Sequence, residues 1–345
     1  MQALVLAGGE GTRLRPLTLT RPKPALRLVD RPFVRFMIDW VSRHGVDEVV
    51  MACGFRAEDL RGALGDEIPG EARIRYVEEP EPLGTAGPVR LAADRGLLDE
   101  RFMVLNGDLL TDLDLSALQA THSERRARAT IALHAVDDPS AYGLVRRGAD
   151  DEVLGFLEKP DPEQIDTDEV NAGAYVLERG VLDLIPAGRA VSIERDVFPR
   201  LVGQGLYGRR LEGYWTDIGT PERYLQASWD ILEGRVESDV SAHEDGVLIE
   251  PDASVAPGAA VGPCAVVGSR CEIEDGATVY RSVLHDDCRV EANAEVHGSI
   301  LGQGVQVGEG ARVGPGSVVG DGARIAAGAV LGDDARVAPE AVVTA

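Results

Sequence analysis

Lysine is rare in this chain. Only Lys23 and Lys159 occur, although Lys and Arg together number 35. Lys23 lies in the run GGEGTRLRPLTLTRPKP, which also contains Arg13, and Lys159 lies in the Pro-bounded run FLEKPDP. A lysine ammonium group is a compact point charge with three rotatable donors, and arginine is not equivalent to it in that role. The two positions are therefore candidates for a specific electrostatic function.

Three glycines, Gly8, Gly9 and Gly11, begin the first of these runs directly after an apolar stretch, MQALVLA. Small residues after a strand let backbone N–H groups approach a phosphate chain or a nucleotide closely. The run matches neither the P-loop nor the dinucleotide-binding fingerprint. Taken alone, it fits a ligand-binding loop and an ordinary tight turn equally well.

Two aspartates are candidates for a metal site. Asp108 ends the apolar run RFMVLNGD, and Asp217 follows an aromatic pair in YWTDIG. Magnesium prefers hard oxygen ligands and takes few of them from the protein. A single Asp at the end of a strand is more often a cap or a turn residue, so the residue type alone leaves both roles open.

The elements that position these residues alternate between strands and helices. Apolar runs of strand length include MQALVLA, DEVVMAC, ARIRYVE and RFMVLNGD, and segments of helical spacing lie between them at 32–44, 56–64 and 86–98. This alternation predicts an α/β fold with a Rossmann-like, mostly parallel sheet that binds ligands at the carboxyl ends of its strands. Further strands are expected at 129–136, 143–147, 153–157, 172–178 and 206–212.

The last hundred residues follow a different period, with an aliphatic residue at every sixth position and two five-residue steps. A small residue precedes nearly every aliphatic anchor by two positions. This pattern resembles the hexapeptide left-handed parallel β-helix, in which each coil has three short strands and the coils stack about 4.8 Å apart. The anchors are Ile249, Val255, Val261, Val267, Ile273, Val279, Leu284, Val290, Val296, Leu301, Val307, Val313, Val319, Ile325, Leu331, Val337 and Val343. We expect a first domain over residues 1–235 and a β-helix domain over 246–345.

The composition excludes several partners. A formal net charge of −23 argues against nucleic acid and against an anionic membrane surface, although a few local cations can still hold small phosphorylated ligands. No apolar run approaches the roughly 20 residues of a membrane span, and the first residues lack the features of a signal peptide, so we expect a cytoplasmic protein.

The cysteines have neither C-x-x-C spacing nor a Cys/His cluster, which argues against a zinc site and favours reduced thiols. Cys271 and Cys288 are expected on one face of neighbouring coils, as two small buried side chains rather than a disulfide. The remaining two are Cys53 and Cys264.

The chain resembles the sugar-1-phosphate nucleotidylyltransferases, most closely the mannose-1-phosphate guanylyltransferase branch. The motifs that carry this resemblance are GGEGTRLRPLT with RPKP, EPLGTAGP at 81–88, LNGD at 105–108, YGLV at 142–145, EKP at 158–160, NAG at 171–173 and WTDIGTP at 215–221. These enzymes join a nucleoside triphosphate and a sugar 1-phosphate into a nucleotide sugar and release pyrophosphate.

The resemblance implies catalytic roles for four residues. Arg13 and Lys23 would neutralise the triphosphate, Lys159 would hold the phosphate of the sugar, and Asp108 would bind Mg²⁺ together with Asp217. No general base is needed, because a phosphate monoester is already an anionic nucleophile, and we assign no catalytic role to the six histidines.

The resemblance also implies residues that bind each substrate. Gly143, Glu158 and Asn171 would surround the sugar hydroxyls. The nucleotide would meet Gly8, Gly9, Gly11, Thr12, Arg13, Lys23, Glu79, Gly84 and Thr85.

Glu79 suggests which base is bound. Family members that use thymidine or uridine nucleotides tend to carry Gln at this position, whereas a carboxylate offers two acceptors for the N1–H and N2–H₂ donors of guanine. Glu78 and Glu79 could equally be surface charges, so thymidylyl or uridylyl transfer to glucose 1-phosphate remains the alternative.

Two alternative functions follow from parts of the sequence. Hexapeptide β-helices occur in acyltransferases, and His285 or His297 could act as a base there. A non-catalytic regulatory subunit would have lost part of the cation and carboxylate set, which is complete here. We expect the β-helix to support assembly into a homo-oligomer.

Overall fold

The computed structural model describes residues 1–54, 56–65 and 72–345. By their internal contacts, these residues form two compact units. Met1–Gly9 and Val34–Trp215 form unit 1, and Glu10–Phe33 and Thr216–Ala345 form unit 2. The Gly-rich run is thus divided, since its first two glycines belong to unit 1 and the rest of it belongs to unit 2.

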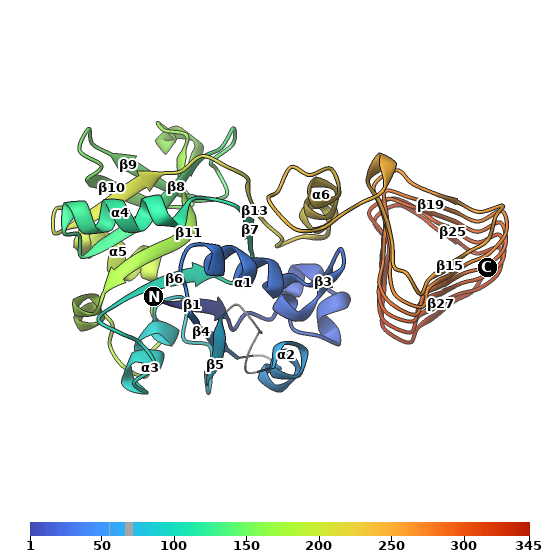
Figure 1. Ribbon diagram of the computed structural model, residues 1–345, viewed down its shortest axis with the longest axis horizontal. Coiled ribbons are helices and arrows are strands. Elements are labelled where there is room, and N and C mark those ends of the chain that lie inside the picture. The colour runs from blue at the N-terminus through green and yellow to red at the C-terminus, as the bar shows by residue number, and fades with distance from the viewer. Residues whose placement is uncertain (55, 66–71) are drawn as a thin grey trace. The chain divides into compact units, whose positions relative to one another are not determined.

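Unit 1 is built on a sheet whose described strands follow the order β10-β9-β11-β6-β1-β4-β5, with β8 between β11 and β12 (Figure 1). The part from β6 to β5 is parallel, whereas β11 pairs antiparallel with both β6 and β8. The strands are β1 (Gln2–Ala7), β4 (Glu48–Cys53), β5 (Arg73–Glu78), β6 (Arg101–Asn106), β8 (Ala129–Ala135), β9 (Gly143–Arg147), β10 (Val153–Glu158), β11 (Glu169–Glu178) and β12 (Leu206–Arg210). The predicted α/β class is confirmed.

Helices pack on this sheet through apolar faces. Helix α3 (Gly87–Asp94) contacts β4 and β5, and its Val89 and Ala92 are fully buried. It ends four residues before the predicted 98, because Gly96 turns the chain with a φ of 70°. The other helices that begin in this part of the chain are α1 (Phe33–Arg43), α2 (Ala57–Leu64), α4 (Leu115–Arg125) and α5 (Phe198–Leu201).

Helix α4 was not predicted from the sequence, although its start signal is clear in the structure. The Asp114 carboxylate accepts the N–H groups of Ser116 and Ala117 at 2.9 and 3.1 Å, which caps the first turn. Two further short strands are β7 (Leu109–Thr111) and β13 (Trp215–Asp217), and β13 spans the boundary between the two units.

Unit 2 contains the repeat as a left-handed parallel β-helix with a triangular cross-section (Figure 1). Its first face is formed by β14 (Val247–Ile249), β17 (Ala265–Val267), β20 (Val283–Leu284), β23 (Ile300–Leu301), β26 (Val318–Val319) and β29 (Arg336–Val337). The second is formed by β15 (Ser254–Val255), β18 (Glu272–Ile273), β21 (Arg289–Val290), β24 (Gln306–Val307), β27 (Arg324–Ile325) and β30 (Val342–Val343). The third is formed by β16 (Ala260–Val261), β19 (Thr278–Tyr280), β22 (Glu295–His297), β25 (Arg312–Val313) and β28 (Val330–Leu331).

The predicted anchors pair directly from coil to coil. Ile249 lies beside Val267, and Val267 lies beside Leu284, so the five-residue step shortens that coil by one residue without moving the anchor off its column. Most of the anchors and of the small residues that precede them belong to one apolar cluster, which is buried in the middle coils and partly buried at Ile249, Val255, Val261 and Val343. All four cysteines lie in the described chain and are free thiols, and Cys271 and Cys288 are buried in the coils as expected.

The rest of unit 2 consists of residues 10–33, which include the hairpin of β2 (Arg27–Leu28) and β3 (Arg31–Pro32), and of helix α6 (Pro221–Leu232). Thr220 caps α6 by accepting the N–H of Arg223 at 3.4 Å, and Pro221 occupies its first position. Within the described parts of the chain, we find no helix with the length and apolar character needed to span a bilayer.

Candidate active site

Strand β1 ends at Ala7, and the glycines that follow lie beside Glu79. A Cβ atom on Gly8 would lie 2.3 Å from Glu79 Oε1, so a larger residue at this position would displace the carboxylate. The other carboxylate oxygen, Oε2, accepts the N–H of Leu83 at 3.1 Å. Burial raises the pKa of Glu79, and the Leu83 hydrogen bond opposes that shift. Glu79 is therefore half-buried and held against the glycine turn, whereas Glu78 is exposed.

The motif that contains Gly84 and Thr85 packs against residues 191–194 and forms hydrogen bonds with them. Gly84 packs against the backbone of Val191, and the Thr85 hydroxyl accepts the N–H of Ile193 at 2.8 Å. The same hydroxyl donates to Glu194 Oε2 at 2.6 Å. The Thr85 side chain thus fixes the loop internally.

Asp108 lies just after β6, at the carboxyl end of a parallel strand, and is half-buried. The preceding Gly107 donates its N–H to the carbonyl of Leu6 in β1 at 3.1 Å. This contact joins the ends of two adjacent strands, so the position of Asp108 depends on the parallel sheet. Such strand ends are where α/β sheets bind their ligands.

The residues predicted to bind the sugar phosphate lie together in unit 1. Gly143 pairs with Glu158 across the β9–β10 hairpin, and Lys159 follows with an exposed side chain. Burial raises the pKa of Glu158, and the nearby Glu194 carboxylate adds to this shift, whereas the charges of Lys159 and Arg195 oppose it.

Asn171 has defined contacts of its own. Its Oδ1 accepts the N–H of Gly173 at 2.9 Å, and its Nδ2 donates to the Tyr175 hydroxyl at 2.9 Å. An amide nitrogen carries two hydrogens, so the second one can serve a sugar hydroxyl.

Unit 2 holds the other predicted cations. The chain turns at Gly11 with a φ of 62°, and the Thr18 hydroxyl donates to the Gly11 carbonyl at 2.9 Å. Thr12 and Arg13 are exposed, whereas Lys23 is only 9% exposed. Of the two predicted cations, Arg13 therefore lies at the surface, whereas Lys23 is surrounded by protein.

Asp217 lies beside two guanidinium groups of the same unit. Its Oδ1 accepts the N–H of Gly219 at 3.0 Å, and its Oδ2 accepts a hydrogen bond from Arg223. A Cβ atom on Gly219 would lie 2.5 Å from Arg13 Nη2 and 2.6 Å from Asp217 Oδ1. A side chain at position 219 would therefore displace the ends of the Arg13 and Asp217 side chains.

The structure therefore groups the predicted residues within each unit. Unit 1 collects the glycine turn with Glu79, the Thr85 loop, Asp108 and the sugar-phosphate residues. Unit 2 collects Gly11, Thr12, Arg13, Lys23 and Asp217. In the described residues, no group of three or more His, Cys, Asp or Glu side chains is arranged to hold a metal ion.

Three charged residues near the predicted site were not predicted from the sequence, namely Glu194, Arg195 and Arg223. The first two lie in a π-helix, Ile193–Val197, a rare geometry that is frequent at functional sites. Arg223 lies on the first turn of α6, which the motif search did not extend to. A predicted helix after the cap Thr220 would have indicated it.

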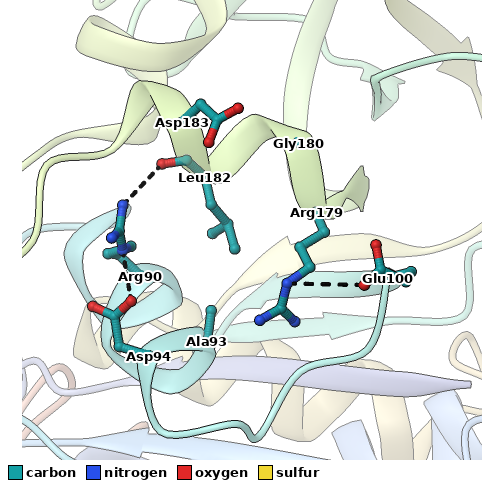
Figure 2. Close-up of a pocket in the computed structure, with 8 residues that line it drawn as sticks. All are labelled: Arg90, Ala93, Asp94, Glu100, Arg179, Gly180, Leu182 and Asp183. Atoms are coloured by element: carbon teal, nitrogen blue, oxygen red, sulfur yellow. Dashed lines mark hydrogen bonds and ion pairs between the residues drawn. The ribbon is translucent and has the colours of Figure 1, made fainter.

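A surface cavity of about 390 Å³ lies elsewhere in unit 1 and is lined by none of the predicted residues (Figure 2). Its two arginines already have partners. Arg90 donates to Asp94 and to the carbonyl of Leu182, and Arg179 faces Glu100 at 4.0 Å. Because these cations are neutralised from within, the cavity offers little to a phosphate.

The fold and these residues together define a class of enzyme. The chain belongs to the nucleotidyl transferase family, because the family model described as Nucleotidyl transferase matches residues 2–234. A second model, described as GMPPB C-terminal domain, matches residues 243–345. The resemblance predicted from the motifs is thereby confirmed, and the protein is a sugar-1-phosphate nucleotidyltransferase.

Curated relatives are similar to this chain over most of their length. A mannose-1-phosphate guanylyltransferase of Mycobacterium tuberculosis is 40% identical over 300 residues, which cover 86% of this chain and 83% of the relative. A mannose-1-phosphate guanyltransferase of Candida albicans is 39% identical, over 90% of this chain and 89% of the relative. Mannose-1-phosphate guanylyltransferase 1 of Arabidopsis thaliana is 36% identical, over 91% and 89%.

A solved structure shares the fold. The crystal structure of HddC from Yersinia pseudotuberculosis matches with a TM-score of 0.58 and 26% sequence identity. The match covers 67% of this chain and 99% of HddC.

Proposed function

We propose that this protein transfers a guanylyl group from GTP to mannose 1-phosphate, forming GDP-mannose and pyrophosphate. The observation that carries the proposal is the similarity to mannose-1-phosphate guanylyltransferases over both parts of the chain, at 36 to 40% identity. The position of Glu79 against the glycine turn supports the choice of guanine, because a half-buried carboxylate there offers acceptors to the guanine N–H donors.

In the proposed reaction, a phosphate oxygen of mannose 1-phosphate attacks the α-phosphorus of GTP. A P–O bond forms to the sugar phosphate, the bond between the α-phosphorus and the bridging oxygen breaks, and that oxygen leaves with pyrophosphate. Both reactants are anions, so the work of the protein is to hold them in line and to offset their charge.

Residues of unit 1 would bind mannose 1-phosphate. Lys159 would bind the phosphate of mannose 1-phosphate, with the charge of Arg195 close by. Glu158 and Asn171 would bind ring hydroxyls, because carboxylate and amide groups form directional hydrogen bonds with them. These contacts orient the attacking oxygen.

The triphosphate end requires the cations of the Gly-rich run. Arg13 would offset charge on the leaving pyrophosphate, and Lys23 would contact the phosphate chain as a point charge. Gly8, Gly9, Gly11 and Thr12 would offer backbone N–H groups, and Gly84 with Thr85 would line the nucleoside pocket.

We propose that Asp108 and Asp217 would hold the magnesium ion. Both offer hard oxygen atoms, and two protein carboxylates with substrate oxygens and water are typical of a magnesium site. Asp217 already carries a cationic partner, Arg223. When bound, the ion supplies positive charge that offsets the charge of the phosphate chain.

The test is pyrophosphate release with magnesium, measured for each combination of GTP, dTTP, UTP, ATP and CTP with mannose or glucose 1-phosphate. A maximum with GTP and mannose 1-phosphate is expected, and Asp108→Asn, which preserves size, is expected to abolish most of it. A maximum with dTTP or UTP and glucose 1-phosphate would overturn the guanine assignment and keep the reaction class. If no combination releases pyrophosphate, the proposed function is wrong.

Acyl transfer receives no support from His285, one of the two histidines considered for it. Its ring is buried, and Nε2 lies 3.0 Å from the Tyr224 hydroxyl, so it does not face a substrate. Assembly into a homo-oligomer and a cytoplasmic location remain part of the proposal, supported by the β-helix and by the nucleotide substrate.

A further inference from the structure

Residues 10–33, which we call the phosphate loop, belong by their contacts to the same unit as the β-helix. This grouping is unexpected, because the sequence places the loop at the start of the predicted catalytic domain. The contacts that produce it are specific and polar. They lie at two places along the loop, one on each side of Lys23.

The first contact joins Thr20 and Arg21 to Asp321 of the β-helix. The Thr20 hydroxyl donates to Asp321 Oδ2 at 2.8 Å, and Arg21 Nε donates to the same oxygen at 3.3 Å. The other oxygen, Oδ1, accepts the N–H of Gln303 in the neighbouring coil at 2.8 Å. The Asp321 side chain is 17% exposed. Its carboxylate is thus fixed by the coil stack and offers its second oxygen to the loop.

The second contact begins at Arg27, whose side chain is 15% exposed. Its guanidinium forms ion pairs with Glu250 and with Asp286, the latter at 2.9 Å. Asp286 also accepts the N–H of Ser269 at 3.0 Å, so the coil stack fixes this carboxylate too.

The backbone of Arg27 is held as well. The Tyr224 hydroxyl of α6 donates to the Arg27 carbonyl and lies 3.0 Å from Nε2 of His285, a buried residue of the β-helix. Side chain and backbone of Arg27 are therefore both connected to the coils.

Lys23 lies between these two anchored positions. Only a few residues separate it from Arg21 on one side and Arg27 on the other, so its backbone has little freedom while both contacts hold. Fixing a flexible backbone costs conformational entropy, and a loop that is ordered in advance does not incur this cost on binding. Placement of the Lys23 ammonium group thus depends on carboxylates that lie more than 200 residues later in the chain.

We propose that the β-helix positions the phosphate loop for the triphosphate, with Asp321, Glu250 and Asp286 as positioning residues. The inference rests on the proposed function for the role of the loop, but its structural part does not. Loss of these carboxylates loosens the loop, weakens binding of GTP, and leaves the sugar-phosphate residues of unit 1 unchanged.

The test uses the full-length protein and Asp321→Asn, which removes the charge and keeps the shape. Losing a charge-assisted hydrogen bond of this kind is expected to raise the KM for GTP about fivefold to tenfold. The KM for mannose 1-phosphate is expected to change less than twofold. Asp321→Glu, which restores the charge, should recover part of the loss.

Amide hydrogen exchange provides a readout that does not require turnover. The loop contains its own backbone hydrogen bonds, for example from Leu14 N–H to Gly11 and from Leu26 N–H to Lys23. In Asp321→Asn, exchange at residues 14–26 should become faster, whereas exchange in β1, β4 and β6 should not change.

Two further variants make the result decisive. Glu291→Gln is the matched control, because Glu291 Oε2 also accepts a backbone N–H from the next coil, that of Glu309 at 3.1 Å, and has no described contact with the loop. Thr20→Val removes the donor from the loop side and leaves the coils intact, so it replaces Asp321→Asn if that variant does not fold.

Unchanged exchange and an unchanged KM for GTP in a folded Asp321→Asn or Thr20→Val would overturn the inference. Equal effects from Glu291→Gln would also overturn it, because they would indicate general damage to the coils. If the wild-type enzyme shows no activity, the proposed function fails, and the exchange measurement still decides whether the β-helix orders the loop.

Discussion

The buried histidine of the β-helix, His285, should make the protein less stable in mild acid. Its ring contacts the Tyr224 hydroxyl and lies near the charges of Asp321, Arg21 and Arg27. Burial disfavours the charged imidazolium, and the two arginines act in the same direction, whereas the Asp321 carboxylate opposes them. Together they lower the pKa of His285 from 6.5 to about 4.

Proton linkage gives the direction and the magnitude of the change in the free energy of unfolding with pH. The unfolded chain binds this proton more readily than the folded protein, so stability is full above about pH 6.5 and decreases until the pH reaches about 4. The complete loss is about 3 kcal/mol, and about 2 kcal/mol of it should appear between about pH 7.5 and about pH 5.

The assay is urea unfolding of the wild type and of His285→Gln at both pH values. Glutamine keeps a polar group near the Tyr224 hydroxyl but cannot bind the proton, so the variant should lose about 2 kcal/mol less than the wild type on acidification. His243→Gln is the control, since His243 is an exposed histidine of the same unit. Equal pH dependence in the wild type and in His285→Gln would refute the reasoning.

Three further predictions concern the proposed reaction. Lys159→Ala should raise the KM for mannose 1-phosphate at least about tenfold and change the KM for GTP less, because a charged hydrogen bond to the sugar phosphate is lost; an equal rise in both constants would contradict the assigned role. Glu79→Gln should reduce the preference for GTP over dTTP. Since the pKa of Glu79 is raised, the wild-type preference should also weaken as the pH falls toward that pKa, and the glutamine variant should show no such weakening in competition assays. Gly219→Ala should push apart Arg13 and Asp217 and lower kcat about tenfold with little change in the free energy of unfolding, and an unchanged kcat would remove this corner from the site.

Much of the fold could be predicted because its periods are strong. The six-residue repeat of the β-helix survives two five-residue steps, and every predicted anchor from Ile249 to Val343 lies on its expected column. The strands of unit 1 were predicted because they are buried apolar runs. Helices α4, α5 and α6 were not predicted, although Thr220 followed by Pro221 is a recognisable start signal for α6.

The residues of the candidate site were predicted from short motifs. The hydrogen bonds that connect these residues to distant parts of the chain could not be predicted. The hydrogen bond between Thr85 and Glu194 joins residues 109 positions apart, and that between Arg21 and Asp321 joins residues 300 positions apart. Neither local spacing nor hydropathy contains information on such pairs. The alternation of charges along the coils marks Asp321 no differently from other acidic residues at turns of the repeat.

The division of the chain into units has a consequence for exchanging parts between related enzymes. A chimera that takes its β-helix from another family member would place a foreign side chain opposite Thr20, Arg21 and Arg27, which come from the beginning of the chain. Such a chimera should work only if residues 10–33 are taken from the same parent as the coils. For the same reason, substitutions in these two distant stretches should compensate for one another when the family diversifies.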